Sequence, residues 1–441
     1  MAPFFFGGVH PRGFKELSCE APILPVRPKI VSIAMSQHIG RPCAPLVSVG
    51  DIVTVGQKIG DGDGLCVPVH ASVSGKVIAV EPRPTPSGTE GLCVVIENDM
   101  QDTLCPDIHK RDSVAELTPE ELTAIIREAG ITGMGGAGFP TNVKISSGMG
   151  KVDTVIVNGA ECEPYITSDD RLMREAPEKI AGGIRIVQKI LQPERTALGI
   201  EKNKGKAIAA MRAALPEDME LLELRVRYPQ GAEKQLIQTV TGRQVPPGGL
   251  PAAVGCAVFN VATCKAVYDA VYEGMPLVRR AVTVTGKAIA RPSNFLAPIG
   301  TPYADLIEAA GGFACEPYKI LCGGPMMGIA QHSLDCGTIK GNNALTCFAQ
   351  EDNHEVETPH CIRCGKCVGV CPMRLMPLQL NKAVQRCDLA ALDKGNVMDC
   401  IECGSCAYIC PAGIPLVQSF RTAKKLLRDE QAKQKAKEAV K

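Results

Sequence analysis

Two cysteine runs in the C-terminal part of the chain constrain its fold more than any other feature. Each has the spacing C-x2-C-x2-C-x3-C-P, one from Cys361 to Pro372 and the other from Cys400 to Pro411. In this spacing three thiolates hold one [4Fe-4S] cluster and the fourth cysteine ligates the neighbouring cluster. The predicted ligands are Cys361, Cys364, Cys367 and Cys410 for one cluster and Cys400, Cys403, Cys406 and Cys371 for the other.

Structural zinc and disulfides are the alternatives for these cysteines. A structural zinc site takes four ligands and gives no reason for a third C-x2 step followed by C-x3-C-P. One spacing that occurs twice therefore favours the cluster pair. The other thirteen of the 21 cysteines follow no pairing pattern, as expected of buried thiols in a reducing compartment.

Charge and hydropathy exclude several classes of protein. The chain has 48 Lys and Arg against 47 Asp and Glu, so nothing indicates a nucleic-acid partner. No apolar stretch is long enough to span a bilayer, and the N-terminus has no signal-peptide pattern. We therefore expect a protein that is soluble, or peripheral on partners that span the membrane. The basic residues from Arg421 onward are expected on a solvated helix end, with binding to anionic lipid or a partner as the lesser possibility.

The first hundred residues divide into a proline-rich segment, 1–36, and a stretch of short β runs, 37–98. We expect the first to be irregular and the second, with strands at 47–50, 52–56 and 73–80, to form a small barrel or sandwich. This stretch is similar to the barrel-sandwich fold of biotinyl and lipoyl carrier domains. His70-Ala-Ser72 stands where a carrier presents its modified lysine, so we expect a structural role.

Residues 117–275 alternate between apolar β runs and amphipathic helices. Thr118, Pro119 and Glu121 predict a capped helix start. The alternation that follows indicates a mostly parallel sheet covered by helices, with ligands at the carboxyl ends of its strands. The predicted strands are 153–158, 196–200, 221–228 and 257–261, and the predicted helices are 176–191, 206–215 and 233–241. A smaller α+β unit follows, with strands at 281–285 and 318–321 and a helix at 303–310.

A glycine loop, Gly133 to Thr141, precedes the first of these strands. It leaves backbone amides uncovered for a phosphate, but a tight structural turn explains a bare glycine cluster about as well. Lys144 follows as a counter-charge, and polar motifs follow three strands at 158–164, 228–233 and 260–263. An anion loop beside three polar strand ends suits the phosphate, ribityl chain and ring of a flavin.

The motifs GGAGFPT, NGAECEP, YPQGAE and NVAT, followed by the cysteine runs, resemble the RnfC/RsxC family of Rnf electron-transport complexes. The middle of the chain is also similar to the FMN- and NADH-binding subunit of respiratory complex I. The resemblance implies a multidomain α/β protein whose Rossmann-like domain binds FMN non-covalently and NAD(H) as substrate. Met134 and Ala232 depart from the complex I pattern, where the family has Arg and an acid.

Carried over motif by motif, the resemblance implies a set of cofactor-binding residues. The glycines would line the flavin phosphate, Phe139 would stack on the nicotinamide side, and two glutamates would meet NADH. Taken singly, each also has a structural interpretation, as a packing aromatic, a solvated lysine or a helix cap. The implied residues are Gly135, Gly136, Gly138, Phe139, Lys144, Asn158, Glu161, Glu163, Tyr228, Gly231, Glu233, Asn260 and Thr263.

The expected domains follow from the same comparison. They are an irregular segment at 1–36, a barrel-sandwich domain at 37–100, a Rossmann-like FMN/NADH domain at 101–279, a β-grasp (SLBB) domain with its linker at 280–350, a two-cluster ferredoxin-type domain at 351–420 and a basic tail at 421–441.

The implied function is a ferredoxin:NAD+ oxidoreductase subunit in a complex that exports Na+ or H+. Such a subunit would lie on the cytoplasmic side of a bacterial membrane, with integral membrane subunits and a ferredoxin-like cluster subunit as partners. Two alternatives remain open at this point. One is a soluble electron-input subunit of a reductase, such as proline reductase, and the other is a scaffold that kept the folds and lost the flavin.

Overall fold

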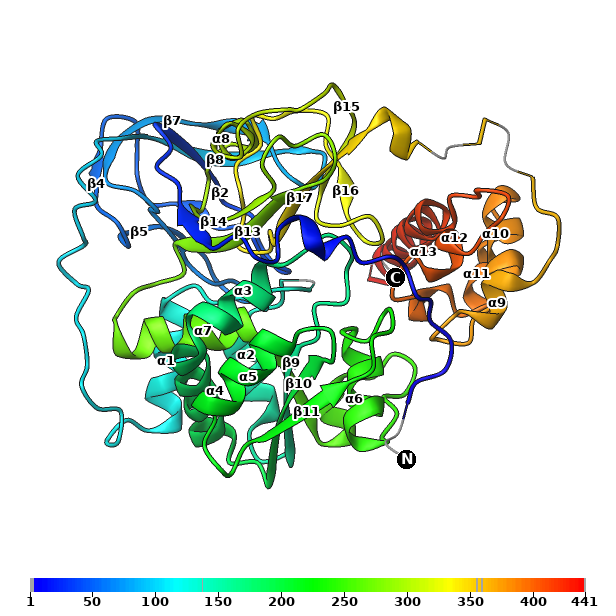
Figure 1. Ribbon diagram of the computed structural model, residues 1–441, viewed down its shortest axis with the longest axis horizontal. Helices are drawn as coiled ribbons and strands as arrows, with labels where there is room; N and C mark the ends of the chain where they lie inside the picture. Colours follow the sequence, from blue (N-terminus) through cyan, green and yellow to red (C-terminus); the bar gives the residue numbers. More distant parts are fainter. Residues whose placement is uncertain (1–3, 137, 354–355, 358–359, 440–441) are drawn as a thin grey trace.

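The computed structural model describes residues 4–136, 138–353, 356–357 and 360–439. Figure 1 shows a β-rich part at the top, an α/β part below it and a helical part at the right. The α/β part holds a four-stranded parallel sheet in the order β11-β10-β9-β12. Its strands are β9 (Thr154–Gly159), β10 (Arg195–Glu201), β11 (Glu220–Leu224) and β12 (Cys256–Asn260).

Helices cover both faces of this sheet, as the alternation predicts. Along β9, Val155 and Val157 pack into the core shared with α1, α4 and α7, whereas Ile156 packs against α6. Buried side chains on both faces are the usual state of a parallel strand. The helices are α1 (Pro119–Glu128), α2 (Thr141–Gly148), α3 (Ser168–Glu175), α4 (Pro177–Leu191), α5 (Gly205–Ala214), α6 (Glu233–Thr241) and α7 (Val261–Tyr272), with a 3-10 turn η2 (Pro251–Val254).

The capped start of α1 is confirmed, and the end of β11 differs from the prediction. The Thr118 hydroxyl accepts from the Glu121 amide, and the Glu121 carboxylate accepts from the Thr118 amide. Strand β11 ends at Leu224, before the predicted residue 228. The reason is that Tyr228 pairs with Val9, outside the sheet.

The barrel-sandwich domain is built from two antiparallel sheets, β2-β8-β7-β4 and β3-β5-β6. The prediction that residues 1–36 are irregular is wrong, because β2 contributes the buried Val31 and Ile33 to this core. The strand predicted at 47–50 does not form. His70 is buried within β6, which agrees with a structural role. The strands are β2 (Ile30–Ala34), β3 (Ala44–Pro45), β4 (Ile52–Val53), β5 (Lys58–Asp61), β6 (Val69–His70), β7 (Gly75–Pro84) and β8 (Glu90–Asn98).

The β-grasp unit contains a six-stranded sheet in the order β1-β14-β13-β17-β15-β16. Its edge strand, β1, comes from the N-terminal segment and pairs in parallel with β14. The three predicted elements form, and β17 extends the unit beyond residue 328. The elements are β1 (Ile23–Pro25), β13 (Arg279–Thr285), β14 (Ser293–Pro298), α8 (Tyr303–Ala309), β15 (Pro317–Cys322), β16 (Ile329–Ala330) and β17 (Ala344–Ala349), with η1 (Lys15–Leu17) and η3 (Gln350–Asp352) beside it.

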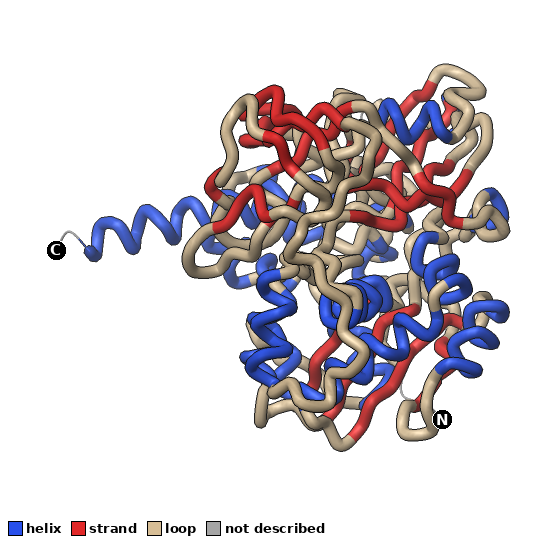
Figure 2. The backbone as a smooth tube through the Cα atoms, turned by 90° about the vertical axis from the view of Figure 1, so that its left-hand side faces the viewer, coloured by secondary structure: helices blue, strands red, loops and turns tan. Residues whose placement is uncertain are grey.

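The cysteine runs lie in a small helical domain. Its last helix, α13, packs Phe420 and Leu427 into that domain and then projects from the body (Figure 2). The predicted basic tail is the continuation of this helix, and its last two residues lie outside the described part of the chain. The helices are α9 (Lys366–Gly369), α10 (Pro377–Gln385), α11 (Leu389–Lys394), η4 (Val397–Asp399), α12 (Ser405–Tyr408) and α13 (Leu416–Ala439).

Residues 5–9, the N-terminal strap, lie between the α/β domain and the helical domain. The Gly8 amide donates to the Val370 carbonyl at 2.8 Å. Val9 and Tyr228 exchange two backbone hydrogen bonds of 2.8 and 2.9 Å. Gly7 and Gly8 have φ of 74° and 82°, and a Cβ on Gly8 would lie 2.5 Å from the Tyr228 carbonyl oxygen. Only glycine allows this approach without strain.

We predict that Gly8→Ala loosens the strap. The new Cβ meets backbone, and the left-handed conformation costs an L-residue about 1–2 kcal/mol. Amide exchange in strap peptides, read by mass spectrometry, should become about tenfold faster, since ~1.4 kcal/mol is tenfold. Gly13→Ala is the matched control, because its Cβ would meet only the Lys15 Cγ, at 3.8 Å. Unchanged exchange in Gly8→Ala would contradict the role of the strap.

Candidate functional site

Two cavities in the helical domain are each lined by four cysteines. Cys361, Cys364, Cys367 and Cys410 line one, the first cage. Cys371, Cys400, Cys403 and Cys406 line the other, the second cage. In each cage three cysteines come from one run and the fourth comes from the other run, which is the exchange that the spacing predicts. Four thiols around one cavity are a donor set that fits a [4Fe-4S] cluster.

The two runs fold alike around their cages. Arg363 and Gly365 have left-handed φ of 57° and 74°. Their counterparts Glu402 and Gly404 have φ of 55° and 78°. This shared turn aims backbone amides at sulfur, and the Glu402 amide donates to the Cys400 Sγ at 3.4 Å. Hydrogen bonds of this kind are one of the factors that set the potential of a bound cluster.

The cages differ in exposure and in what they face. Cys361 and Cys364 of the first cage are exposed, whereas Cys403 and Cys406 of the second are 8% and 9% exposed. Cys403 packs in one small cluster with Tyr228 of the α/β domain. The second cage therefore lies against the domain that carries the glycine loop, and the first cage has exposed cysteines.

We predict that Cys371→Ala removes the cluster of the second cage, although Cys371 belongs to the first run. The EPR spectrum of the reduced variant should match that of Cys403→Ala and differ from that of Cys364→Ala. Cys387→Ala is the control, because Cys387 is exposed and lines neither cavity. A Cys371→Ala spectrum that matches Cys364→Ala would contradict the crossed ligation.

The glycine loop lies against the carboxyl ends of the strands. The Met134 amide donates to the Thr263 hydroxyl at 2.9 Å, and the Gly133 amide donates to the Phe139 carbonyl at 2.8 Å. Gly135 has φ of 80°, and a Cβ there would come within 2.9 Å of the Asn260 Nδ2. Ala137 lies outside the described residues, so the loop is described only on either side of it.

Amide side chains meet at the ends of neighbouring strands. Asn158 of β9 stands opposite Asn260 of β12. The Asn158 Nδ2 donates to the Gly231 carbonyl at 2.8 Å, and the Asn260 Nδ2 donates to the Asp169 Oδ2 at 2.7 Å. The Asp169 Oδ1 is buried and has no hydrogen-bond partner among the described residues. It is an acceptor free to take a hydroxyl or N–H proton of a ligand.

Glu161 is a second carboxylate with a free oxygen. Its Oε1 accepts from the Asp169 amide at 2.6 Å, and its Oε2 has no hydrogen-bond partner in the described part of the chain. The Lys15 Nζ lies 3.7 Å from that oxygen. Burial raises the pKa of Glu161 to about 7, although Lys15 opposes the shift. This carboxyl can therefore hold or release a proton near neutral pH.

Other predicted residues have partners inside the protein. The Lys144 Nζ lies 2.8 Å from the Glu233 Oε1 and donates to the Val258 carbonyl at 3.0 Å. The Glu163 Oε1 accepts from the amides of Met326 and Met327 at 2.7 and 3.1 Å. Glu163 is thus engaged by the loop after β15, and its predicted role toward NADH stays a prediction.

Buried cations near Glu161 were not predicted from the sequence. Lys204 and Glu201 form an ion pair of 3.4 Å with side chains only 2% exposed, and the Lys204 Nζ also donates to the Glu161 carbonyl. Lys15 donates to the Glu163 and Ile166 carbonyls. No motif marks these lysines, because their partners lie far away in the sequence.

The residues present fit a flavin mononucleotide. The exposed glycines of the loop offer amides to a phosphate, whose oxygens only accept. The free oxygens of Glu161 and Asp169 offer acceptors to the hydroxyls of a ribityl chain. Donors at one end and acceptors at the other are what such a ligand requires.

None of the helices in the described part of the chain combines the length and the hydropathy needed to span a bilayer.

Four protein families match consecutive parts of the chain. Residues 4–101 match the RnfC barrel sandwich hybrid domain, and 126–269 match the Nuo51 FMN-binding domain. Residues 281–330 match the SLBB domain, and 360–414 match the 4Fe-4S dicluster domain. The predicted fold class is confirmed, and the matched domains support FMN and [4Fe-4S] clusters as the cofactors.

Curated relatives match nearly the whole chain, and each is the RnfC component of its complex. The component from the Na(+)-translocating ferredoxin:NAD(+) oxidoreductase complex of Acetobacterium woodii is 46% identical over 96% of this chain and 96% of its own. The one from the proton-translocating complex of Clostridium ljungdahlii is 46% identical over 99% and 97%. The one from the ion-translocating oxidoreductase complex of Rhodobacter capsulatus is 43% identical over 97% and 84%. The chain therefore belongs to the RnfC family of ion-translocating ferredoxin:NAD+ oxidoreductase complexes.

Proposed function

We propose that this chain is the NAD(H)-reacting, peripheral subunit of an ion-translocating ferredoxin:NAD+ oxidoreductase complex. The observation that carries the proposal is the packing of Tyr228, from the domain with the glycine loop, against Cys403 of the second cage. One chain thereby brings a candidate flavin site and a candidate cluster site into contact. The names of the relatives supply the reaction and the membrane complex.

FMN, when bound, supplies two-electron hydride chemistry, and the [4Fe-4S] clusters supply one-electron transfer. The role of the chain is to hold these groups in a fixed order. The amides of Gly135, Gly136 and Gly138 hold the phosphate. Asn158 and Asn260 orient the ligand from the strand ends.

Two carboxylates in the site have different roles. Glu161 is buried, and its pKa near 7 lets Oε2 hold or release the proton that accompanies hydride transfer. Glu233 is 40% exposed on its side chain and paired with Lys144, at the start of α6. Its second carboxylate oxygen can accept hydrogen bonds from the ribose hydroxyls of NAD(H).

The cages define a direction through the chain. The second cage lies against the α/β domain, and Gln235 of α6 contacts Met373 beside it at 3.4 Å. The exposed cysteines of the first cage suit contact with another protein. We propose that integral membrane subunits and a ferredoxin-like cluster subunit meet the chain here, on the cytoplasmic side of a bacterial membrane.

The alternative of a soluble electron-input subunit for a reductase is not favoured, because the relatives that match the full chain are named as subunits of ion-translocating complexes. The alternative of a scaffold without flavin is not favoured either, because the FMN-binding domain matches through 126–269.

We predict that Glu233→Gln weakens apparent NADH affinity and leaves FMN content unchanged. Loss of a charged acceptor costs on the order of 1.5–3 kcal/mol. The affinity should therefore fall roughly ten- to a hundredfold, since about 1.4 kcal/mol is tenfold. Steady-state NADH oxidation with an artificial acceptor measures this, beside a flavin assay of the same sample.

Glu178→Gln is the matched control for this prediction, because Glu178 is also an acid in the first turn of a helix, α4. It should leave both readouts unchanged. An NADH dependence of Glu233→Gln equal to that of the control would return Glu233 to a helix N-terminal charge paired with Lys144.

A further inference from the structure

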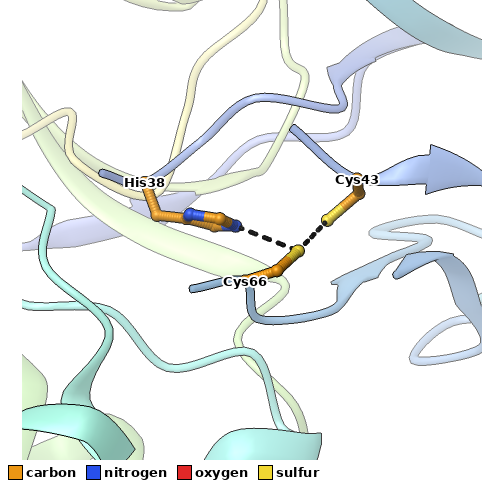
Figure 3. Close-up of side chains that lie close together, drawn as sticks. All are labelled: His38, Cys43 and Cys66. Atoms are coloured by element: carbon orange, nitrogen blue, oxygen red, sulfur yellow. Dashed lines mark hydrogen bonds between the residues drawn. The ribbon is translucent and has the colours of Figure 1, made fainter. Parts of the chain in front are cut away.

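Three soft donor groups meet in the barrel-sandwich domain, outside both cages. His38 lies in the loop after β2, Cys43 immediately before β3, and Cys66 between β5 and β6 (Figure 3). Their ligand atoms all lie within 4.8 Å of one another. Both thiols are buried, and the imidazole is half-buried. Neither the cluster runs nor the flavin motifs include these residues.

The spacing of the donor atoms matches the needs of a tetrahedral zinc ion. The Cys43 and Cys66 sulfurs are 3.4 Å apart, and the His38 Nε2 lies 3.7 Å from the Cys66 sulfur. With Zn–S bonds of about 2.3 Å and Zn–N bonds of about 2.0–2.1 Å, a tetrahedron places two sulfurs about 3.8 Å apart and a sulfur and a nitrogen about 3.6 Å apart. These two separations need change by only a few tenths of an ångström to admit the ion.

The imidazole of His38 is held in the orientation of a metal ligand. Its Nδ1 lies 3.2 Å from the Ile39 carbonyl oxygen, which can only accept, so Nδ1 carries the proton. The lone pair is then on Nε2, the atom that faces Cys66. A backbone carbonyl on the far nitrogen is the usual second contact of a zinc-bound histidine. The Val67 amide now donates to Nε2 at 3.3 Å, and a metal would replace that bond.

Backbone contacts hold the two loops of this cluster together. The Arg41 amide donates to the Leu65 carbonyl at 3.0 Å, one residue before Cys66. Gly40 has φ of 133°, and a Cβ there would lie 2.0 Å from that same oxygen. The close approach therefore requires glycine, and it fixes the donors before any metal arrives.

The charge around the cluster suits a thiolate-bound dication. Burial and the adjacent Cys66 thiol raise the pKa of Cys43 to about 12, so the thiol stays protonated unless a metal displaces the proton. The buried Lys340 Nζ, which donates to the Pro68 and Gly130 carbonyls at 2.7 Å each, provides a positive charge that favours thiolates. Two thiolates and Zn²⁺ sum to zero, so Lys340 meets no net charge.

We propose that His38, Cys43 and Cys66 bind one Zn²⁺ ion, with a water molecule as the fourth ligand on the half-exposed side of His38. Two soft thiolates and one imidazole favour zinc over the oxygen-seeking Mg²⁺ and Ca²⁺. The site does not depend on the proposed function. It also lies beside the glycine loop, because the Ile39 amide donates to the Gly138 carbonyl at 3.1 Å.

The test uses the full chain, purified anaerobically from zinc-supplemented cells. Elemental mass spectrometry should find about one zinc per chain beside the cluster iron. Zinc X-ray absorption should show two sulfur neighbours at about 2.3 Å and nitrogen or oxygen neighbours at about 2.0 Å. The Cys43→Ala/Cys66→Ala double variant should lose the zinc and keep the iron.

Cys93→Ala/Cys256→Ala is the matched control, because both thiols are buried and lie outside the cluster. It should keep both metals. If the double variant at the site fails to fold, His38→Ala, at a half-exposed position, should still weaken zinc retention against a chelator at least about tenfold.

Three results would overturn the proposal. The first is iron-replete protein with only trace zinc. The second is a shell of four sulfurs around the zinc, which would place the ion in an iron-depleted cage. The third is a disulfide between Cys43 and Cys66 in the anaerobically prepared chain.

Discussion

The contact of the N-terminal strap with Tyr228 and with the first cysteine run is the interaction on which the rest of the arrangement depends. Residues 5–9 hydrogen bond to the α/β domain on one side and to Val370 on the other. Cys371, the residue after Val370, is a member of the second cage. The strap thus fixes the second cage beside the domain with the glycine loop, and two left-handed glycines make that approach possible.

The crossed cysteines extend this constraint to both cages. Because each run contributes one thiol to the other cage, neither cage can be placed without its neighbour. The buried cage faces inward and the exposed cage carries the outward cysteines. At the inner end, the free oxygens of Glu161 and Asp169 and the open loop amides complete the site. Packing, charge and cofactor chemistry therefore point along one line through the chain.

Local patterns predicted what local patterns determine. The cysteine spacing predicted which thiols share a cavity, and apolar runs such as Val155–Val157 predicted the parallel sheet. The structure of residues 1–36 was not predicted, because β2 and the strap have partners far away in the sequence and lie between prolines and glycines. Lys15 and the engagement of Glu163 by Met326 escaped for the same reason. His38, Cys43 and Cys66 have no spacing typical of a zinc site, and only folding brings them together.

The most direct test of the account is single-turnover NADH formation by the isolated chain. The clusters are reduced anaerobically, excess reductant is removed, and NAD+ is added while NADH absorbance is followed. The account predicts NADH from the native chain and none from a Gly135→Val variant that keeps its iron and lacks FMN, because a Cβ at Gly135 would lie 2.9 Å from the Asn260 Nδ2 and valine cannot easily adopt φ of 80°. Equal NADH formation by the FMN-free variant would contradict it.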